Sequence, residues 1–501
     1  MTQTPRRNLV IVGGGTAGWM AASYLNRFLV RKGWQITLVE SPDIGTIGVG
    51  EATIPSLVRF LRAMDFDEDV FMRRCAATYK LGIAFTDWFG HGHRYFHPFG
   101  ICGSINGLDL FHFWMKHRIE GQATEAYTDY SLQSLLADEA KGPRQHGADS
   151  PIMRTGTYAF HLDAGAFAQF LKEVATAEGV RHLFGEVRAV RRDPWGDIAA
   201  IDIGGGRELA GDLFIDCTGF RGLLIEETLG DPWIDWGRYL LCDRAVVMPL
   251  PREDDPLPYT RSTALDAGWM WQIPLSTRTG NGYVYSSQHA SPDQAAQALI
   301  DRADLRRARS ADPRHLKMRI GRRGNGWVRN CVAVGLASGF VEPLESTGIH
   351  LIQRALELLV DNFPAGDRDD LLRAAYNRRM QALYEEVRDF IVLHYVLTDR
   401  VEPFWRDARS VAIPDTLQDS LDAYEMDGRM HLTHSDIFSE TNHHFILAGN
   451  GRLPRRPTAR VDFTPLQPIV PVLRQIREQN RAMAASLPSH RALIAAINAN
   501  P

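Results

Sequence analysis

A glycine-rich loop near the N-terminus limits what this chain can fold into. The pattern Gly13-x-Gly15-x-x-Gly18 follows an apolar segment, 9–12, and precedes a segment with helical spacing, 19–30. Such glycines allow a tight turn, close approach of a pyrophosphate to the backbone, and close packing of helix on strand. An acidic residue 22 positions after Gly18 ends the next apolar segment and can bind an adenosine ribose. We therefore predict a dinucleotide site that includes Gly13, Gly15, Thr16, Ala17, Gly18 and Glu40.

The glycine loop alone does not separate FAD from NAD, but two later segments favour FAD. Residues 213–217 form an apolar strand that ends in Thr218-Gly219, and residues 331–334 precede Gly335-Leu336-Ala337. Flavoproteins of the aromatic hydroxylase type return to the cofactor with such strands, although ordinary strand–turn boundaries would look the same. The expected fold is therefore α/β, with an FAD-binding Rossmann-type domain of the flavin monooxygenase (aromatic hydroxylase) superfamily.

Apolar spacing predicts the elements around this domain. A strand is expected over 328–334 and β-rich segments over 185–216 and 230–290, whereas 80–114 has no clear period and indicates loops and short strands. Helices are expected over 164–177, 348–362, 370–398 and 469–485. A break at Pro364 and Gly366 predicts two parts: an FAD-binding domain with inserted substrate-site strands, 1–365, and a mostly helical region that covers the substrate and packs on it, 366–501.

Composition excludes several classes of protein. The net charge of −4 and the pI near 6.5 leave no electrostatic footprint for nucleic acid or an anionic membrane. The five cysteines are far apart and form no C-x-x-C pair, so we expect neither a disulfide framework nor a metal site. No signal peptide and no apolar run of roughly 20 residues is evident, so we expect a cytoplasmic protein with no membrane partner.

Four motifs together resemble one enzyme family. They are Gly48-Val49-Gly50-Glu51-Ala52-Thr53-Ile54-Pro55, Tyr79-Lys80-Leu81-Gly82, the W-x-W-x-I-P block in Gly268-Trp269-Met270-Trp271-Gln272-Ile273-Pro274, and Phe340-Val341-Glu342-Pro343-Leu344-Glu345-Ser346-Thr347-Gly348. In this order they resemble the flavin-dependent tryptophan and indole halogenases, from Leu9 to about residue 400. The resemblance implies that reduced FAD, oxygen and chloride or bromide produce hypohalous acid, which halogenates a small aromatic substrate. It also implies a separate NAD(P)H-dependent flavin reductase as the source of FADH2.

The resemblance assigns two catalytic side chains and a halide site. Lys80 matches the lysine that directs the oxidant, by a hydrogen bond or as a haloamine, and Glu345 matches the glutamate beside the aromatic ring. From the sequence alone, Glu342 is an alternative to Glu345 as the glutamate beside the aromatic ring. The halide would be bound by the amides of Thr347 and Gly348, and the start of a helix at Gly348 supports an anion there independently. The positions that match flavin contacts are Ala52, Leu336 and Ile349.

Further matches concern the walls of the site. His97, Phe99 and Ser346 match residues of the substrate pocket, although a histidine packed in an aromatic loop would look like His97. Trp269 and Trp271 alternate, so on a strand they point the same way. The resemblance implies that Trp269, Trp271, Ile273 and Pro274 separate flavin from substrate; an aromatic core pair is the alternative. Glu51 is either near the flavin or structural.

One region departs from the family pattern. Tryptophan halogenases have a tyrosine pair and a later glutamate that bind the amino acid, whereas residues 440–450 read Glu-Thr-Asn-His-His-Phe-Ile-Leu-Ala-Gly-Asn. This favours an indole-like substrate over free tryptophan. A single-component FAD-dependent hydroxylase and a non-catalytic FAD-binding protein remain alternatives, and the chain is expected to be a monomer or homodimer.

Overall fold

The dinucleotide motif follows the carboxyl end of β1, an inner strand of a six-stranded sheet. The computed structural model describes residues 7–43, 50–122, 124–302, 312–363 and 369–499. The strand order is β10-β2-β1-β14-β24-β23, in which the first five strands run parallel and β23 is antiparallel. The strands are β1 (Arg7–Val12), β2 (Trp34–Glu40), β10 (Arg181–Phe184), β14 (Leu213–Asp216), β23 (Trp327–Val328) and β24 (Cys331–Ala333). This confirms the expected Rossmann-type α/β fold.

Strand β1 is buried on both faces, as parallel strands usually are. Leu9 and Ile11 contribute to the main hydrophobic core, whereas Val10 and Val12 point into a second cluster on the other face. Helix α1 (Thr16–Leu29) connects β1 to β2, and α7 (Ala164–Ala177) and α10 (Gly348–Asp361) pack against α1. The strand expected over 328–334 is wrong in one respect. A turn at Arg329, with φ 52°, divides it into the antiparallel pair β23 and β24.

A second, eight-stranded sheet contains the W-x-W-x-I-P block. Its order is β21-β16-β20-β19-β18-β5-β6, and β17 pairs with β20. Its strands are β5 (Gly82–Thr86), β6 (Arg94–Pro98), β16 (Arg244–Val247), β17 (Leu250–Pro251), β18 (Thr260–Leu265), β19 (Gly268–Pro274), β20 (Arg278–Tyr285) and β21 (Arg314–Lys317). Residues 80–114 are thus more regular than the expected loops and short strands: β5 and β6 are central to the site, and α4 (Leu110–Ile119) was missed. Strand β5 is buried on both faces, so it shows no alternation.

Smaller elements join the two sheets. Strands β3 (Gly50–Ala52), β9 (Ala159–Asp163) and β4 (Thr78–Lys80) form one short sheet between them. The other strands are β7 (Ser104–Ile105), β8 (Leu108–Asp109), β11 (Ala189–Arg192), β12 (Ile198–Asp202), β13 (Glu208–Ala210), β15 (Trp233–Asp235), β22 (Gly321–Arg323) and β25 (Gly339–Phe340). The other helices before residue 303 are α2 (Ser56–Ala63), α3 (Glu68–Arg74), α5 (Leu132–Asp138), α6 (Pro151–Thr155) and α8 (Pro292–Arg302).

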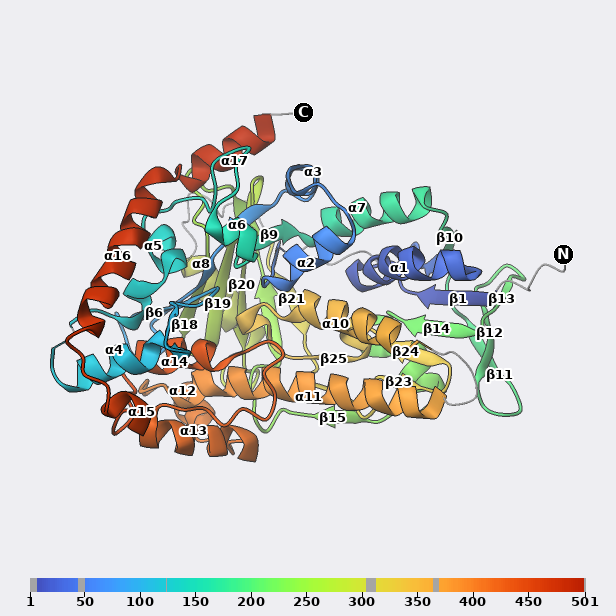
Figure 1. Cartoon of the computed structure of the whole chain (residues 1–501). Helices are drawn as coiled ribbons and strands as arrows, with labels where there is room; N and C mark the ends of the chain where they lie inside the picture. The colour runs from blue at the N-terminus through green and yellow to red at the C-terminus, as the bar shows by residue number, and fades with distance from the viewer. Residues whose placement is uncertain (1–6, 44–49, 123, 303–311, 364–368, 500–501) are drawn as a thin grey trace.

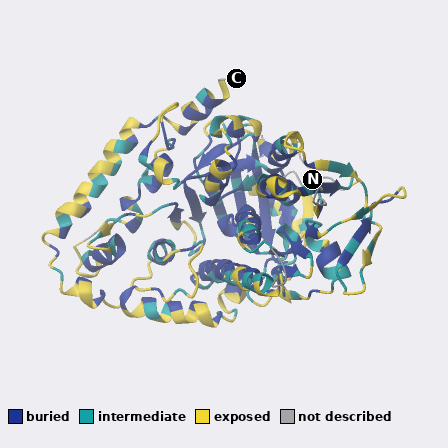
Figure 2. Ribbon diagram, turned by 45° about the vertical axis from the view of Figure 1, so that its right-hand side comes forward, coloured by how far each residue is buried: buried dark blue, intermediate teal, exposed yellow. Residues whose placement is uncertain are grey.

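The C-terminal part of the described chain is helical, as expected. It contains α11 (Asp369–Val396), α12 (Pro403–Arg409), α13 (Asp415–Asp427), α14 (Glu440–Gly449), α15 (Ala459–Asp462), α16 (Ile469–Ser486) and α17 (His490–Ala499), of which α11 and α16 were predicted individually. Helix α11 runs beside α10, and α16 and α17 lie at the edge opposite the Rossmann sheet (Figure 1). The buried residues concentrate in the sheets and inner helices (Figure 2).

The two parts share a hydrophobic core. One continuous cluster contains residues from Leu9 to Ile497. The division at residue 365 stays a prediction, and residues 364–368 lie outside the described residues. Helix α17 reaches back to the N-terminal half: the amide of Tyr79 donates to His490 Nε2 at 3.2 Å, and His490 Nδ1 donates to the carbonyl of Pro256 at 2.7 Å. Among the described residues, no helix combines the length and hydropathy needed to cross a bilayer.

Candidate active site

The glycine loop has the shape that a pyrophosphate requires. Gly13 has φ 118°, and a Cβ there would lie 2.3 Å from the carbonyl oxygen of Cys217. A Cβ on Gly18 would lie 1.8 Å from the carbonyl oxygen of Gly13, so these two glycines are needed for packing. Around Gly15, no atom lies within 4 Å of the position of a Cβ, which leaves the backbone open to a phosphate at the start of α1. The loop therefore fits a dinucleotide such as FAD.

Two further elements meet this loop. Gly335 has φ 70°, and a Cβ there would lie 2.8 Å from Cβ of Ala17, so the turn that contains Leu336 lies against the start of α1. On the other side, Oε2 of Glu40 lies 3.3 Å from Nζ of Lys172 and 2.7 Å from Nε2 of His182. Sequence reasoning missed these two neighbours of Glu40, because α7 and β10 carry no motif.

Lys80 is completely buried at the end of β4. Its Nζ donates to the carbonyl of Thr53 at 3.0 Å and to Oγ of Ser346 at 2.8 Å, and it lies 5.1 Å from the ring centroid of Phe99. Burial lowers the pKa of Lys80 to about 7, although the charge of Glu345 opposes the shift. The side chain therefore exists as both ammonium and amine near neutral pH.

Glu345 lies between two histidines at the end of the turn before α10. His97 Nδ1 donates to Oε2 at 2.9 Å, and His394 Nε2 lies 2.9 Å from Oε1 without hydrogen-bond geometry. Burial alone would raise the pKa of Glu345, but His97 and His394 outweigh it and lower the pKa to about 2. Glu345 is therefore an ionised carboxylate held in a dry environment.

The backbone between Glu345 and α10 makes a sharp turn. Ser346 has φ 61°, and Thr347 is the N-cap residue of α10, which begins at Gly348. The first amides of a helix have no intrahelical acceptor, and the helix dipole adds partial positive charge there. A Cβ on Gly348 would meet no atom within 4 Å, so this end of the helix borders open space. Ile349, the second residue of α10, is buried.

Strand β19 brings the two tryptophans to the same face. Their ring centroids are 6.2 Å apart, and both side chains are buried. Trp271 packs flat over Gly282, where a Cβ would lie 2.3 Å from the ring. Ile273 and Pro274 are buried at the end of β19, and the carbonyl of Pro274 accepts a hydrogen bond from Thr78 in β4 at 2.6 Å. The W-x-W-x-I-P block is thus tied to the strand that carries Lys80.

Two other acids near the site differ from Glu345. Glu342 is fully buried, and Nε1 of Trp269 donates to its Oε2 at 3.4 Å. Burial raises the pKa of Glu342 to about 7 and that of Glu51 also to about 7. The Glu51 side chain lies on β3, and the start of that motif, Gly48 and Val49, lies outside the described residues.

The structure brings most of the expected residues together. Lys80, Ser346, Glu345, His97 and Phe99 form one connected set of contacts, and Ala52 adjoins Thr53, whose carbonyl binds Lys80.

Three neighbours of this set were missed. His394 lies on α11, the OH of Tyr95 hydrogen bonds its Nδ1 at 2.8 Å, and Nδ2 of Asn442 lies 2.9 Å from His97 Nε2. A single histidine or asparagine far along a helix gives no spacing signal, so sequence analysis had no means to find them.

The chain is similar to known enzymes along nearly its whole length. The chain matches the family described as tryptophan halogenase over residues 8–465. The tryptophan 6-halogenase SttH of Streptomyces toxytricini is 36% identical over 523 residues, which cover 99% of each protein. The solved structure of Xcc4156, a flavin-dependent halogenase from Xanthomonas campestris, has 42% identity and a TM-score of 0.92 over 98% of each chain. That of BrvH, a flavin-dependent halogenase from Brevundimonas sp. BAL3, has 39% identity and a TM-score of 0.91 over 98% of this chain and 99% of that one.

These matches run along nearly the whole chain and agree in sequence and in structure. They also confirm the family resemblance that the four motifs indicated. The protein belongs to the tryptophan halogenase family of flavin-dependent enzymes.

Proposed function

We propose that this protein halogenates an indole-like ring and that Lys80 controls the delivery of the halogen. The observation that carries the proposal is the position of the Lys80 amine, which is fully buried and donates to Ser346 Oγ at 2.8 Å, next to Glu345 in the chain. A buried amine with a pKa of about 7 can hydrogen bond hypohalous acid as an ammonium or form a haloamine as an amine. Both routes remain open.

The substrate ring would lie between Lys80 and Glu345. Electrophilic attack by the halogen places positive charge on the ring, and an ionised carboxylate in a dry pocket stabilises that charge. Glu345 then accepts the ring proton and restores aromaticity. A carboxylate with a pKa of about 2 is a weak base, but it suffices because the protonated, halogenated ring is a strong acid.

The cofactor and halide would be held at the other side of the tryptophan strand. Bound reduced FAD would supply two electrons to O2 and the halide would supply two more, so that the halide leaves as hypohalous acid and the second oxygen atom leaves as water. The loop Gly13, Gly15 and Gly18 would hold its pyrophosphate at the open backbone of Gly15, and the amides of Thr347 and Gly348 would bind chloride or bromide. Trp269 and Trp271 keep the ring substrate away from the flavin. The described residues contain one glycine-loop β-α-β unit, which supports supply of FADH2 by a separate reductase.

The substrate is proposed to lack the amino acid portion of tryptophan. Several relatives are named tryptophan halogenases, for example SttH, but residues 440–450, which include helix α14, contain no tyrosine pair here. His443 is buried and packs edge-on against Phe390, with ring centroids 4.8 Å apart. Burial lowers the pKa of His443 to about 4, so it offers no positive charge to a carboxylate near neutral pH.

The test combines one variant with one assay. Lys80→Met keeps an apolar chain of similar length, so we expect FADH2 oxidation to continue while bromination of indole falls to background in mass spectrometry. Lys141→Met is the matched control, because Lys141 donates to the carbonyl of Leu487 at the surface of the helical region. Normal bromination by Lys80→Met would refute the role of Lys80, and hydroxylated indole without bromide would refute halogenation.

The substrate proposal has its own test. Turnover of indole, tryptamine and tryptophan at equal concentration should give the lowest kcat/KM for tryptophan. A kcat/KM for tryptophan above that of indole would contradict the proposal while leaving the role of Lys80 intact.

A further inference from the structure

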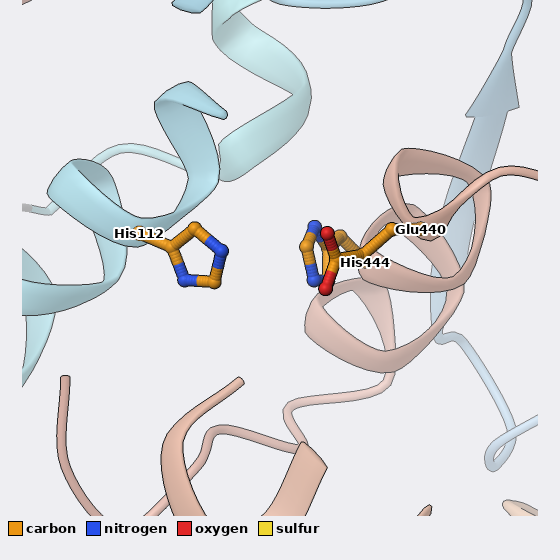
Figure 3. Close-up of side chains that lie close together, drawn as sticks. All are labelled: His112, Glu440 and His444. Atoms are coloured by element: carbon orange, nitrogen blue, oxygen red, sulfur yellow. The ribbon is translucent and has the colours of Figure 1, made fainter. Parts of the chain in front are cut away.

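We propose that His112, Glu440 and His444 bind a divalent transition-metal ion between α4 and α14. One ligand atom from each of these side chains lies within 4.8 Å of the other two. Ligands of a tetrahedral ion with bonds of about 2.0–2.1 Å are about 3.4 Å apart, so small rotations of the side chains would complete the site. Figure 3 shows a ring nitrogen of His112 directed toward Glu440 and His444.

The geometry of α14 explains why two of the ligands lie together. Glu440 and His444 are four residues apart, so they project from the same face of the helix. Glu440 is also anchored, because its Oε1 accepts a hydrogen bond from the amide of Met430 at 2.7 Å. His112 approaches from α4, which packs against α14 through Phe111: its ring is stacked on that of His444 with centroids 3.7 Å apart.

His444 has the hydrogen-bond arrangement of a metal ligand. Its Nε2 donates to the carbonyl of Gly428 at 2.8 Å, so Nε2 carries the hydrogen and Nδ1 carries the lone pair. Nδ1 is buried and has no hydrogen-bond partner, and the whole residue has no exposed surface. Metal-binding histidines are oriented by such a bond from the second ring nitrogen to a carbonyl.

His112 presents its other ring nitrogen, Nε2, to the site: in Figure 3 the nitrogen that faces Glu440 and His444 is the one farther from the point where the side chain joins the ring. Its Nδ1 faces away and is buried without a partner, and only 4% of the residue is exposed. The buried Nδ1 of His444 lacks the partner that polar nitrogens inside a protein normally have, and a bound cation would supply one.

The charges around the three side chains are mixed. The negative charges of Asp109 and Asp427 act on the His112 ring. The positive charge of Arg429 acts in the opposite direction, and its guanidinium donates a hydrogen bond to Asp427. Two imidazoles and one carboxylate suit zinc, cobalt or nickel, whereas magnesium and calcium prefer oxygen ligands alone. Three protein ligands leave one position for water.

The ion would join α4 to the helix that borders the halogenation pocket. Asn442 lies between Glu440 and His444 in sequence, and its amide contacts His97. A metal that fixes α14 against α4 would therefore also fix Asn442. This inference does not depend on the proposed substrate or on the role of Lys80.

The experiment measures metal binding by the full-length, untagged protein. The protein is stripped with a chelator and titrated with ZnCl2 and, separately, CoCl2. Retained metal is counted by mass spectrometry after desalting, and the visible absorption of cobalt reports its coordination. His112→Gln and Glu440→Gln each remove one ligand, and Glu440→Gln keeps an acceptor for the Met430 amide. His434→Gln, which removes an exposed histidine of the preceding loop, is the matched control.

We expect one retained zinc per chain in the wild type and in His434→Gln, and affinity at least about 100-fold weaker in both ligand variants, a loss at the upper end of that seen when an outer-shell partner is removed. Zinc should also raise the melting temperature of the wild type but not of the ligand variants. Circular dichroism and melting without metal establish that each variant folds. Equal retention by wild type and both ligand variants would overturn the proposal, as would a wild type that retains no zinc.

Discussion

The surroundings of two ionisable side chains in the pocket, Lys80 and Glu345, shift their pKa values. Burial brings the pKa of Lys80 to about 7, while His97 and His394 hold the pKa of Glu345 at about 2. Pairs of groups with separated pKa values are typical of sites that use one as a proton donor and the other as an acceptor. The motifs identified Lys80 and Glu345, but not His394, because its role depends on where α11 packs.

Glu345→Gln should slow the aromatic step alone. A neutral amide cannot stabilise the ring cation or take its proton, so we expect bromination to fall about 100-fold or more. FADH2 oxidation should be unchanged, because Glu345 contacts no residue of the glycine loop. Glu357→Gln, on the same helix α10, is the control. A parallel loss of flavin oxidation in Glu345→Gln would argue for a structural role instead.

The buried lysine should also affect stability in a pH-dependent way. Below about pH 7 the folded and unfolded proteins both carry the Lys80 proton, so the full penalty of burying the cation persists. Between pH 7 and the ordinary pKa of 10.5 only the unfolded chain is protonated, so the stability of the wild type rises relative to Lys80→Met. The expected slope is at most about 1.4 kcal/mol per pH unit. Urea denaturation of both apo proteins at pH 7 and pH 9 measures it; parallel curves would contradict the lowered pKa.

At the scale of elements, the glycine loop followed directly from the sequence, whereas the second sheet was expected only as strands over 230–290 and short strands over 80–114, without their pairing. The loop, α1 and β2 follow from local spacing and from glycines whose roles are set by nearby backbone. Strands β5 and β6 lie mostly in the interior of the molecule, so consecutive residues are buried and the alternation that marks a half-exposed strand is missing. The pair β23 and β24 was read as one strand, because a turn at Arg329 that contains no glycine gives little signal.

Two alanine substitutions should separate packing from cofactor binding in the glycine loop. Gly15 has φ −78° and ψ −173°, which alanine adopts easily, and its surroundings are open. Gly15→Ala should therefore leave the melting temperature of the apo protein unchanged and weaken FAD binding by at least about tenfold, measured by fluorescence titration. Gly13→Ala should instead destabilise the fold by about 1–3 kcal/mol. Unchanged FAD affinity in Gly15→Ala would show that the pyrophosphate lies elsewhere.

At the scale of the whole molecule, the C-terminal helices contribute His394 and Asn442 to the candidate site, where they lie beside Glu345 and His97. Sequence analysis expected the helical region to cover the substrate, and the shared hydrophobic core shows how closely the parts pack. It did not predict α17, in which His490 accepts a hydrogen bond from the amide of Tyr79. Contacts between residues so far apart in the chain leave no local pattern.

His490→Phe should test this long-range contact. Phenylalanine fills the space but leaves the buried amide of Tyr79 without an acceptor, which should destabilise the protein by about 1–3 kcal/mol in urea. Because Tyr79 precedes Lys80, bromination should fall more than FADH2 oxidation. Equal loss of both activities would mean that the contact stabilises the fold without acting on Lys80. His434→Gln again serves as the control.

The bond between Tyr79 and His490 spans 411 residues of sequence. During translation, the strand that bears Lys80 leaves the ribosome long before the hydrogen-bond acceptor of Tyr79 has been made. A polypeptide that ended after Pro274 and before His490 would carry the entire glycine loop and both tryptophans, yet its β4 would remain without this anchor. Because the same hydrophobic core extends to Ile497, we expect such a shortened chain to lose its fold as well as this hydrogen bond.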